Sequence, residues 1–173
     1  LRFLGDGVQT LSFTPDATTA SQGLVTLAEA NLTSHIQLVG IEGVDMGGMY
    51  DARFIVPAAA NPTDSLIIAA GVDQLDGTQA ALVVTGTVGG VTIGPVAFYQ
   101  NQTLVVDTST QVGGSDLIRL TGATNNHDNV NLSVRTGAAS SGTDEIRVTG
   151  PLALGGALTL DAGDIDVQAD VQL

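Results

Sequence analysis

The two stretches GSDLIRLTG (114–122) and GTDEIRVTG (142–150) decide the fold class of this chain. They begin 28 residues apart and keep Gly, Asp, Ile, Arg, Thr and Gly in register. In the first copy Ile118 and Leu120 alternate with polar residues, a period of two that is typical of a half-buried β-strand and not of a helix. An internal repeat of this length indicates a solenoid or another repetitive β architecture.

Similar apolar pieces, each ending in glycine, recur along the rest of the chain. They end at Gly71, Gly86, Gly122, Gly137, Gly150 and Gly163, and apart from one gap of 36 residues these glycines lie 13 to 15 residues apart. We therefore expect residues 64–173 to be a regular β-repeat segment with more than about half of its residues in strands, against an average of about 20–25%. Residues 1–63 are less regular and predict a β-rich N-terminal or capping region, continuous with the repeats as one domain.

The alternation also predicts which side chains of the repeat segment point into a core. Aromatic residues make up only 3% of the chain, so this core must be thin and aliphatic. The residues expected to be buried are Ile118, Leu120, Val130, Leu132, Val134, Ile146, Val148, Ile165 and Val167.

Two all-β architectures fit this pattern. In a β-solenoid (β-helix), two units of 13–15 residues form one coil of about 28 residues, and equivalent strands of successive coils stack in parallel. In an antiparallel β-sandwich, each unit is one strand and its turn, although strands there usually recur every 8–12 residues or so. The 28-residue register favours the solenoid.

Two segments resemble a known group of proteins. ALGGALTLDAGDIDVQADVQL (153–173) and LVVDTSTQVGGSDLIRLTG (104–122) resemble the imperfect repeats of filamentous-haemagglutinin-type proteins and other very large bacterial surface proteins. The resemblance covers roughly residues 64–173. It implies a secreted or cell-surface, right-handed β-helical segment of a bacterial protein, which serves as a stalk, coat or adhesin and has no chemistry of its own.

Charge restricts the partners that the chain can have. The formal net charge is −13, with no lysine and only five basic residues. Such a charge repels phosphate backbones and anionic lipid headgroups at long range. No segment approaches the roughly 18 apolar residues of a membrane-spanning helix. We expect neither a nucleic-acid partner nor membrane insertion.

The sequence shows no catalytic machinery. There are two histidines, and no nucleophile elbow, His-Glu-x-x-His motif or phosphate-binding loop is present. Asp116 and Asp144 could approach each other on adjacent coils, as the paired carboxylates of β-helical glycosidases do. Both, however, occupy the same place in the repeat, just before a strand, where aspartate commonly serves the turn. We predict that the protein is not an enzyme.

Acidic turns make calcium a possible cofactor, because Ca²⁺ takes six to eight oxygen ligands or so from carboxylates, carbonyls and amides. The turns DQLDG (73–77), TNNHDN (124–129) and DAGDID (161–166) supply such oxygens, although none matches an EF-hand loop. The candidate ligands are Asp73, Asp76, Asp128, Asp161, Asp164 and Asp166. Turn-forming Asp and Asn residues alone would give similar sequences.

The sequence as a whole predicts a secreted or cell-surface structural β-protein, a non-enzymatic segment of a fibre, coat or adhesin. Its partners would be neighbouring repeats of a longer chain or other copies of itself, because residues 164–173 lack the Gly, Pro and Lys that normally blunt a sheet edge. The alternative is a Ca²⁺-dependent carbohydrate-binding or adhesive module, in which exposed rings of Tyr50, Phe98 and Tyr99 would form the sugar platform.

Overall fold

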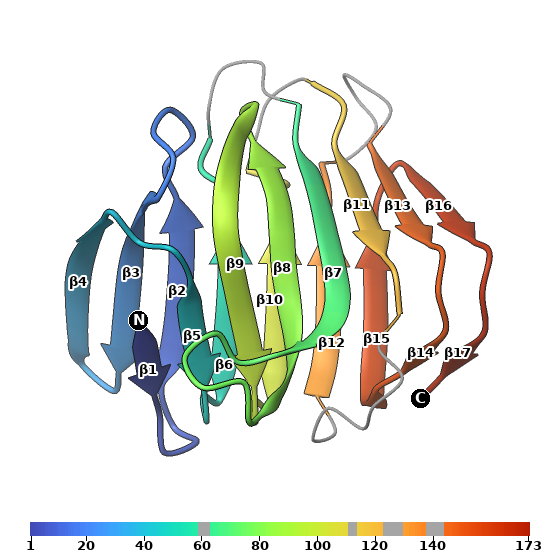
Figure 1. Cartoon of the computed structure of the whole chain (residues 1–173). Coiled ribbons are helices and arrows are strands. Elements are labelled where there is room, and N and C mark those ends of the chain that lie inside the picture. Colours follow the sequence, from blue (N-terminus) through green and yellow to red (C-terminus); the bar gives the residue numbers. More distant parts are fainter. Residues whose placement is uncertain (59–62, 111–113, 123–129, 138–143) are drawn as a thin grey trace.

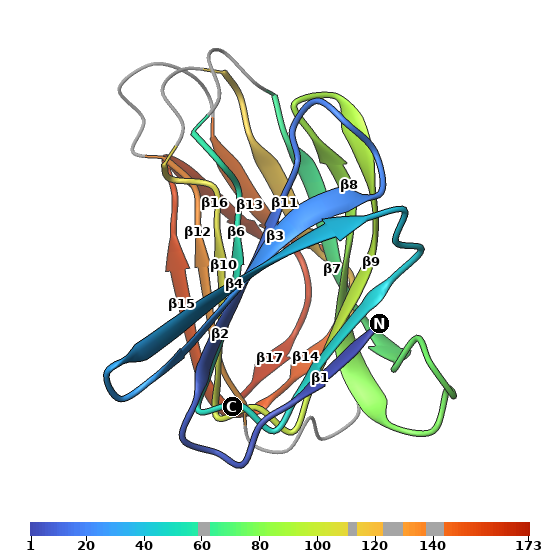
Figure 2. The same cartoon turned by 90° about the vertical axis from the view of Figure 1, so that its left-hand side faces the viewer.

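The chain folds entirely into β-strands and turns. The computed structural model describes residues 1–58, 63–110, 114–122, 130–137 and 144–173, and none of these residues is helical. Consequently no described helix is long and apolar enough to cross a membrane. Two large sheets lie face to face and enclose the core, an arrangement compatible with a β-sandwich (Figure 2). The prediction of an all-β fold is confirmed.

The first sheet contains eight strands. Their spatial order is β1 (Arg2–Leu4), β5 (Val44–Gly47), β9 (Val91–Tyr99), β8 (Ala80–Val88), β7 (Ser65–Val72), β11 (Leu117–Leu120), β13 (Glu145–Val148) and β16 (Asp164–Val167).

The second sheet contains seven strands, and a short parallel pair lies near the C-terminus (Figure 1). The seven strands follow the order β15 (Gly155–Asp161), β12 (Val130–Arg135), β10 (Thr103–Asp107), β6 (Asp51–Ile55), β2 (Thr10–Pro15), β3 (Gln22–Glu29) and β4 (Leu32–Val39). The short pair consists of β14 (Leu152–Ala153) and β17 (Val171–Gln172). Strands β7 to β17 hold more than half of the described residues in 64–173, as the sequence predicts.

The 28-residue repeat of the sequence is also a repeat in space. Strands β11 and β13 pair in parallel, with Ile118 opposite Ile146 and Arg119 opposite Arg147. Strands β10 and β12 repeat this in the second sheet, where Leu104 lies opposite Leu132. From β10 to β13 the chain passes alternately between the two sheets. The predicted parallel stacking of these copies is confirmed.

Two antiparallel insertions make both sheets mixed. Strands β3 and β4 form a hairpin that extends the edge of the second sheet, and β8 runs antiparallel to both β7 and β9 in the first. The apolar piece LVVTG (82–86), which ends at Gly86, lies in β8 and is therefore antiparallel to both of its neighbours. The two large sheets are neither wholly parallel nor wholly antiparallel.

The core between the sheets is mostly aliphatic, as expected for the repeats, and it also contains the buried rings of Phe13, Phe54 and Phe98. Seven of the nine residues predicted to be buried are at most 4% exposed, namely Ile118, Leu120, Val130, Leu132, Val134, Ile146 and Val148. Burial of each such side chain contributes about 1.5–3 kcal/mol. The prediction is wrong for Ile165 and Val167, which are 43% and 53% exposed. They lie in register with Ile146 and Val148, but β16 is an edge strand, and no other strand among the described residues pairs with its outer side.

Glycine is required for steric reasons at position 150, where it ends one of the parallel copies. A Cβ atom at this position would lie 2.4 Å from the carbonyl oxygen of Thr121, the equivalent corner of the preceding copy. No side chain fits at such a distance, so the close approach of successive corners requires glycine here.

Candidate functional site

An ionic cluster joins the N-terminal strand to the first sheet. The guanidinium of Arg2, on β1, contacts the carboxylates of Asp73 and Asp76 in the turn after β7 and lies 3.8 Å from the carboxylate of Asp45 on β5. It also lies 5.8 Å from the ring centroid of Tyr99 on β9. Asp45 and Asp73 are almost fully buried. Because a buried carboxylate is costly without a partner, Arg2 compensates both.

The same turn is ordered by its own carboxylates. Oδ1 of Asp73 accepts a hydrogen bond from the amide of Gln79 at 2.6 Å, and Oδ1 of Asp76 accepts one from the hydroxyl of Thr78 at 2.6 Å. The Thr78 hydroxyl, followed by Asp73 and Arg2, lowers the pKa of Asp76 to about 2. The carboxylate of Asp76 is therefore ionised at neutral pH and available to Arg2.

The cluster accounts for two of the predicted calcium ligands. Asp73 and Asp76 do lie together, but a guanidinium from the far N-terminus of the chain is already bound between them. Sequence reasoning missed this contact, because Arg2 and Asp73 are 71 residues apart.

The remaining calcium candidates do not gather into a site. Asp161 and Asp164 are exposed, and Asp166 lies 3.7 Å from Nε of Arg147. Asp128 lies outside the described residues. Within the described part of the chain, no three His, Cys, Asp or Glu side chains come together as a metal site.

The three aromatic candidates for a sugar platform do not share a surface. Tyr50 is 55% exposed, whereas Phe98 and Tyr99 on β9 are 3% and 5% exposed. One exposed ring does not make the stacking platform that the carbohydrate-binding alternative requires.

A column of buried aspartates runs across the first sheet at the start of β7, β11 and β13. The amide of Asp64 donates to Oδ1 of Asp116 at 3.1 Å, and the amide of Asp116 donates to Oδ1 of Asp144 at 3.0 Å. The predicted approach of Asp116 and Asp144 is confirmed. Asp64 was missed, although it also follows a Ser or Thr and precedes an inward apolar residue by two positions.

Burial raises the pKa of Asp116 to about 6. The negative charges of Asp64 and Asp144 also raise this pKa, whereas hydrogen bonds from Thr108 and from the Asp64 amide lower it. Asp116 is only 3% exposed. The column therefore serves the backbone of adjacent copies and presents no open carboxylate pair to a substrate.

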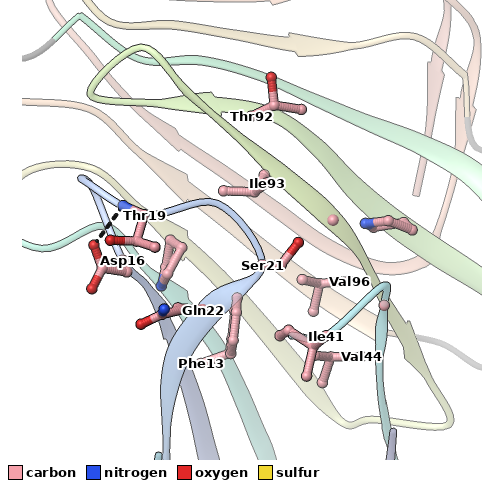
Figure 3. A pocket seen from close by; sticks show the side chains of 14 residues that line it. Phe13, Asp16, Thr19, Ser21, Gln22, Ile41, Val44, Thr92, Ile93 and Val96 are labelled. Atoms are coloured by element: carbon pink, nitrogen blue, oxygen red, sulfur yellow. Dashed lines mark hydrogen bonds between the residues drawn. The ribbon is translucent and has the colours of Figure 1, made fainter. Parts of the chain in front are cut away.

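A cavity between the sheets is too small for a ligand. It lies between β9, which contributes Thr92, Ile93 and Val96, and the turn from β2 to β3, where Oδ1 of Asp16 accepts a hydrogen bond from the amide of Thr19 at 2.9 Å (Figure 3). Its volume is about 10 Å³, room for about one water molecule.

The most unusual surface lies at the two ends of the sheets. Strand β4 forms one edge of the second sheet and exposes Leu32, Ile36 and Val39, and β16 forms the opposite edge of the first sheet and exposes Ile165 and Val167 (Figure 1). Edge strands with apolar side chains and no lysine or proline are templates for pairing with another strand. These ends are the candidate functional site.

The fold and these ends define a β-protein with mixed, partly repetitive sheets and exposed edges. Comparison with protein-family models, with curated proteins and with solved structures finds no match.

Proposed function

We propose that this chain is a right-handed β-solenoid segment of a secreted or cell-surface bacterial fibre, coat or adhesin, with a structural role and no catalytic activity. The observation that carries this proposal is the parallel, in-register pairing of residues 28 positions apart, Ile118 with Ile146 and Arg119 with Arg147. Pairing of like residues in successive copies is how solenoids build a continuous core from units that cannot fold alone.

The proposed role is mechanical. Backbone ladders run across both sheets, and fully buried aliphatic residues such as Ile118, Leu120, Ile146 and Val148 stack between them. Such packing resists compression and bending because protein interiors are close-packed. Strand β8 interrupts the parallel pairing of the first sheet, and the β3–β4 hairpin extends the second sheet beyond β2.

The outer face of the stack is ionic and compensates its own like charges. Arg119 and Arg147 lie side by side in register, which is unfavourable for two cations. Arg147 is also 2.6 Å from the carboxylate of Glu145 and 3.7 Å from that of Asp166. Partly exposed ion pairs of this kind contribute about 0–1 kcal/mol each, so they serve the solubility of the face more than its stability.

Neither calcium nor carbohydrate is needed for this role. Arg2 supplies the positive charge that the carboxylates of Asp45 and Asp73 require, and only Tyr50 of the three candidate rings is exposed. The alternative of a Ca²⁺-dependent adhesive module therefore has no supporting cluster among the described residues.

The location of the protein tests the proposal. Antibodies against the folded chain should label intact cells of the source organism, and brief protease treatment of intact cells should remove the label. A cytoplasmic control protein should be labelled only after permeabilisation. If this chain, too, is labelled only after permeabilisation, the proposed surface role is wrong.

A further inference from the structure

The two ends of the molecule carry uncovered inner faces that belong to opposite sheets. On β4, Ile36 lies opposite the fully buried Val25 of β3, so Ile36 and Leu32 are on the inner face, yet they are 41% and 69% exposed. On β16, Ile165 and Val167 are inward by register but half exposed. The second sheet therefore lacks a cover at one end, and the first sheet lacks one at the other.

The free edges at these ends have matching strand directions. Strand β4 is related to β2 by two antiparallel pairings, and β2 is related to β15 by parallel pairings only, so β4 and β15 run the same way. In the first sheet, β1 and β16 also run the same way, because the antiparallel pairings on the two sides of β8 cancel. A second copy placed head to tail would continue both ladders in parallel.

The edges also match in length. Strands β4 and β15 contain eight and seven residues, and β1 and β16 contain three and four. The long edges belong to one sheet and the short edges to the other. Head-to-tail stacking therefore pairs long with long and short with short.

Charge disfavours the symmetric arrangement of two C-terminal ends. The end formed by β15, β16 and β17 carries exposed Asp161, Asp164 and Asp170, and two such ends in contact would bring like charges together. Strand β4, with the sequence LTSHIQLV, has no acidic residue and contains His35. The acidic end is therefore better matched by β4 than by another acidic end.

We propose that the partner of each end is a second copy of this chain, docked head to tail. In this contact, β4 of one copy pairs with β15 of the next, and Leu32 and Ile36 cover the inner face around Ile165 and Val167. The inference rests on the proposed structural function and deepens it by naming the partner and the strands. A heterologous contact of this kind propagates into filaments unless it closes into a ring.

Two variants block one end each. Ile36→Lys places a charge on the inner face of β4, and Val167→Lys does so on β16. Gln37→Lys and Asp164→Asn are the matched controls, because each makes the same change in charge on the outward face of the same strand. Each Lys replaces a side chain that is at least 41% exposed, so the monomer fold is expected to survive, which circular dichroism checks.

The experiment measures mass by light scattering and analytical ultracentrifugation at rising salt, which screens the −13 charge over a Debye length of about 8 Å at physiological ionic strength. Wild type and both controls should grow into species of several copies. Ile36→Lys and Val167→Lys should each remain monomeric alone. An equal mixture of the two should form dimers and nothing larger, because the Ile36→Lys chain can pair only through its C-terminal end and the Val167→Lys chain only through its N-terminal end.

Three results would overturn the inference. Wild type that stays monomeric while folded would show that the ends do not pair. Self-dimers of Val167→Lys would show a symmetric contact through β4. A mixture that remains monomeric while wild type assembles would show that another surface is used. None of these results bears on surface labelling of cells, so the proposed function can fail or stand independently.

Discussion

The backbone amide of Asp116 donates a hydrogen bond to Oδ1 of Asp144 at 3.0 Å, although the two residues are separated by one full repeat of 28 residues. The amide of Asp64 makes the equivalent contact to Asp116 at 3.1 Å. The carboxylates of Asp116 and Asp144 thus each accept a hydrogen bond from the backbone amide of the equivalent aspartate on the adjacent strand. The cost is a column of buried acidic groups, and this cost makes stability depend on pH.

The first prediction concerns that dependence. Burial raises the pKa of Asp116 from 3.8 to about 6, so the folded chain prefers the protonated carboxyl. Stability from this group is fully present below pH 3.8 and is lost as the pH rises through about 6. Urea denaturation should give a free energy of unfolding about 1 kcal/mol higher at pH 5 than at pH 7 from this group alone.

The Asp116→Asn variant isolates the effect. Asparagine keeps an oxygen that can accept the Asp64 amide but carries no charge, so this variant should be more stable than wild type at pH 7. The difference between variant and wild type should shrink at pH 5. A difference that is the same at both pH values would show that Asp116 does not titrate in this range.

The second prediction compares two isoleucines that occupy the same register position. Ile146 on β13 is fully buried, whereas its partner Ile165 on β16 is 43% exposed. Ile146→Ala should lower the free energy of unfolding by about 2–5 kcal/mol, because it removes buried apolar atoms and leaves a cavity. Ile165→Ala should cost less than half as much in dilute monomer. Equal costs in chemical denaturation would show that the end of the stack is covered.

The parallel register of the repeats was predictable from the sequence for a simple physical reason. Copies that share residue types at each position bury the same side chains only if they stack in register, as Ile118 and Ile146 do. The alternation also gives the correct inner face for Ile165, but it does not say whether a further strand covers that face. The alternation within a strand determines which of its side chains point inward, whereas the burial of those side chains depends on which other strands lie against them.

The antiparallel strand β8 could not be predicted from its own pattern. LVVTG (82–86) has the same alternation and terminal glycine as the parallel copies. The direction of β8 is set by the turns on either side. The sequence feature that indicates an antiparallel hairpin is the pair Gly89 and Gly90, and their φ values of 58° and 80° in the structure suit a two-residue hairpin turn. Likewise, the acidic turn at Asp73 was recognised, but its partner Arg2 is distant in sequence and only the fold brings them together.

The third prediction concerns this anchoring of the N-terminal strand. Arg2→Ala leaves Asp45 and Asp73 buried without a cation, so the melting temperature should fall, and Arg2→Lys should restore only part of it, because one ammonium cannot reach all three carboxylates. Amide exchange should rise at Gly5, which donates to the carbonyl of Gly47 at 2.8 Å.

Arg53→Ala is the control for that prediction. Arg53 contacts one carboxylate, that of Asp51 on its own strand, and its side chain is 45% exposed, so its loss should lower the melting temperature less than loss of Arg2, which contacts three carboxylates. If the two alanine variants melt at the same temperature and Gly5 exchanges at the wild-type rate in both, Arg2 does not anchor β1.

The last prediction tests the 28-residue register directly, and the absence of cysteine from the chain makes it clean. Arg119 and Arg147 are partners on adjacent parallel strands, which lie about 4.7–4.9 Å apart. This spacing falls within the Cα separation of about 4.4–6.8 Å that a disulfide tolerates. The double variant Arg119→Cys with Arg147→Cys should therefore oxidise to an intramolecular disulfide while folded.

The pair Arg119→Cys with Glu145→Cys is the control, because Glu145 lies opposite Leu117, two residues out of register. Mass spectrometry of oxidised, digested protein should find the linked peptides in the first variant and only free thiols in the second. Efficient linkage in the control and not in the registered pair would mean that the copies are shifted along the strand, and the proposal of stacked repeats would lose its main support.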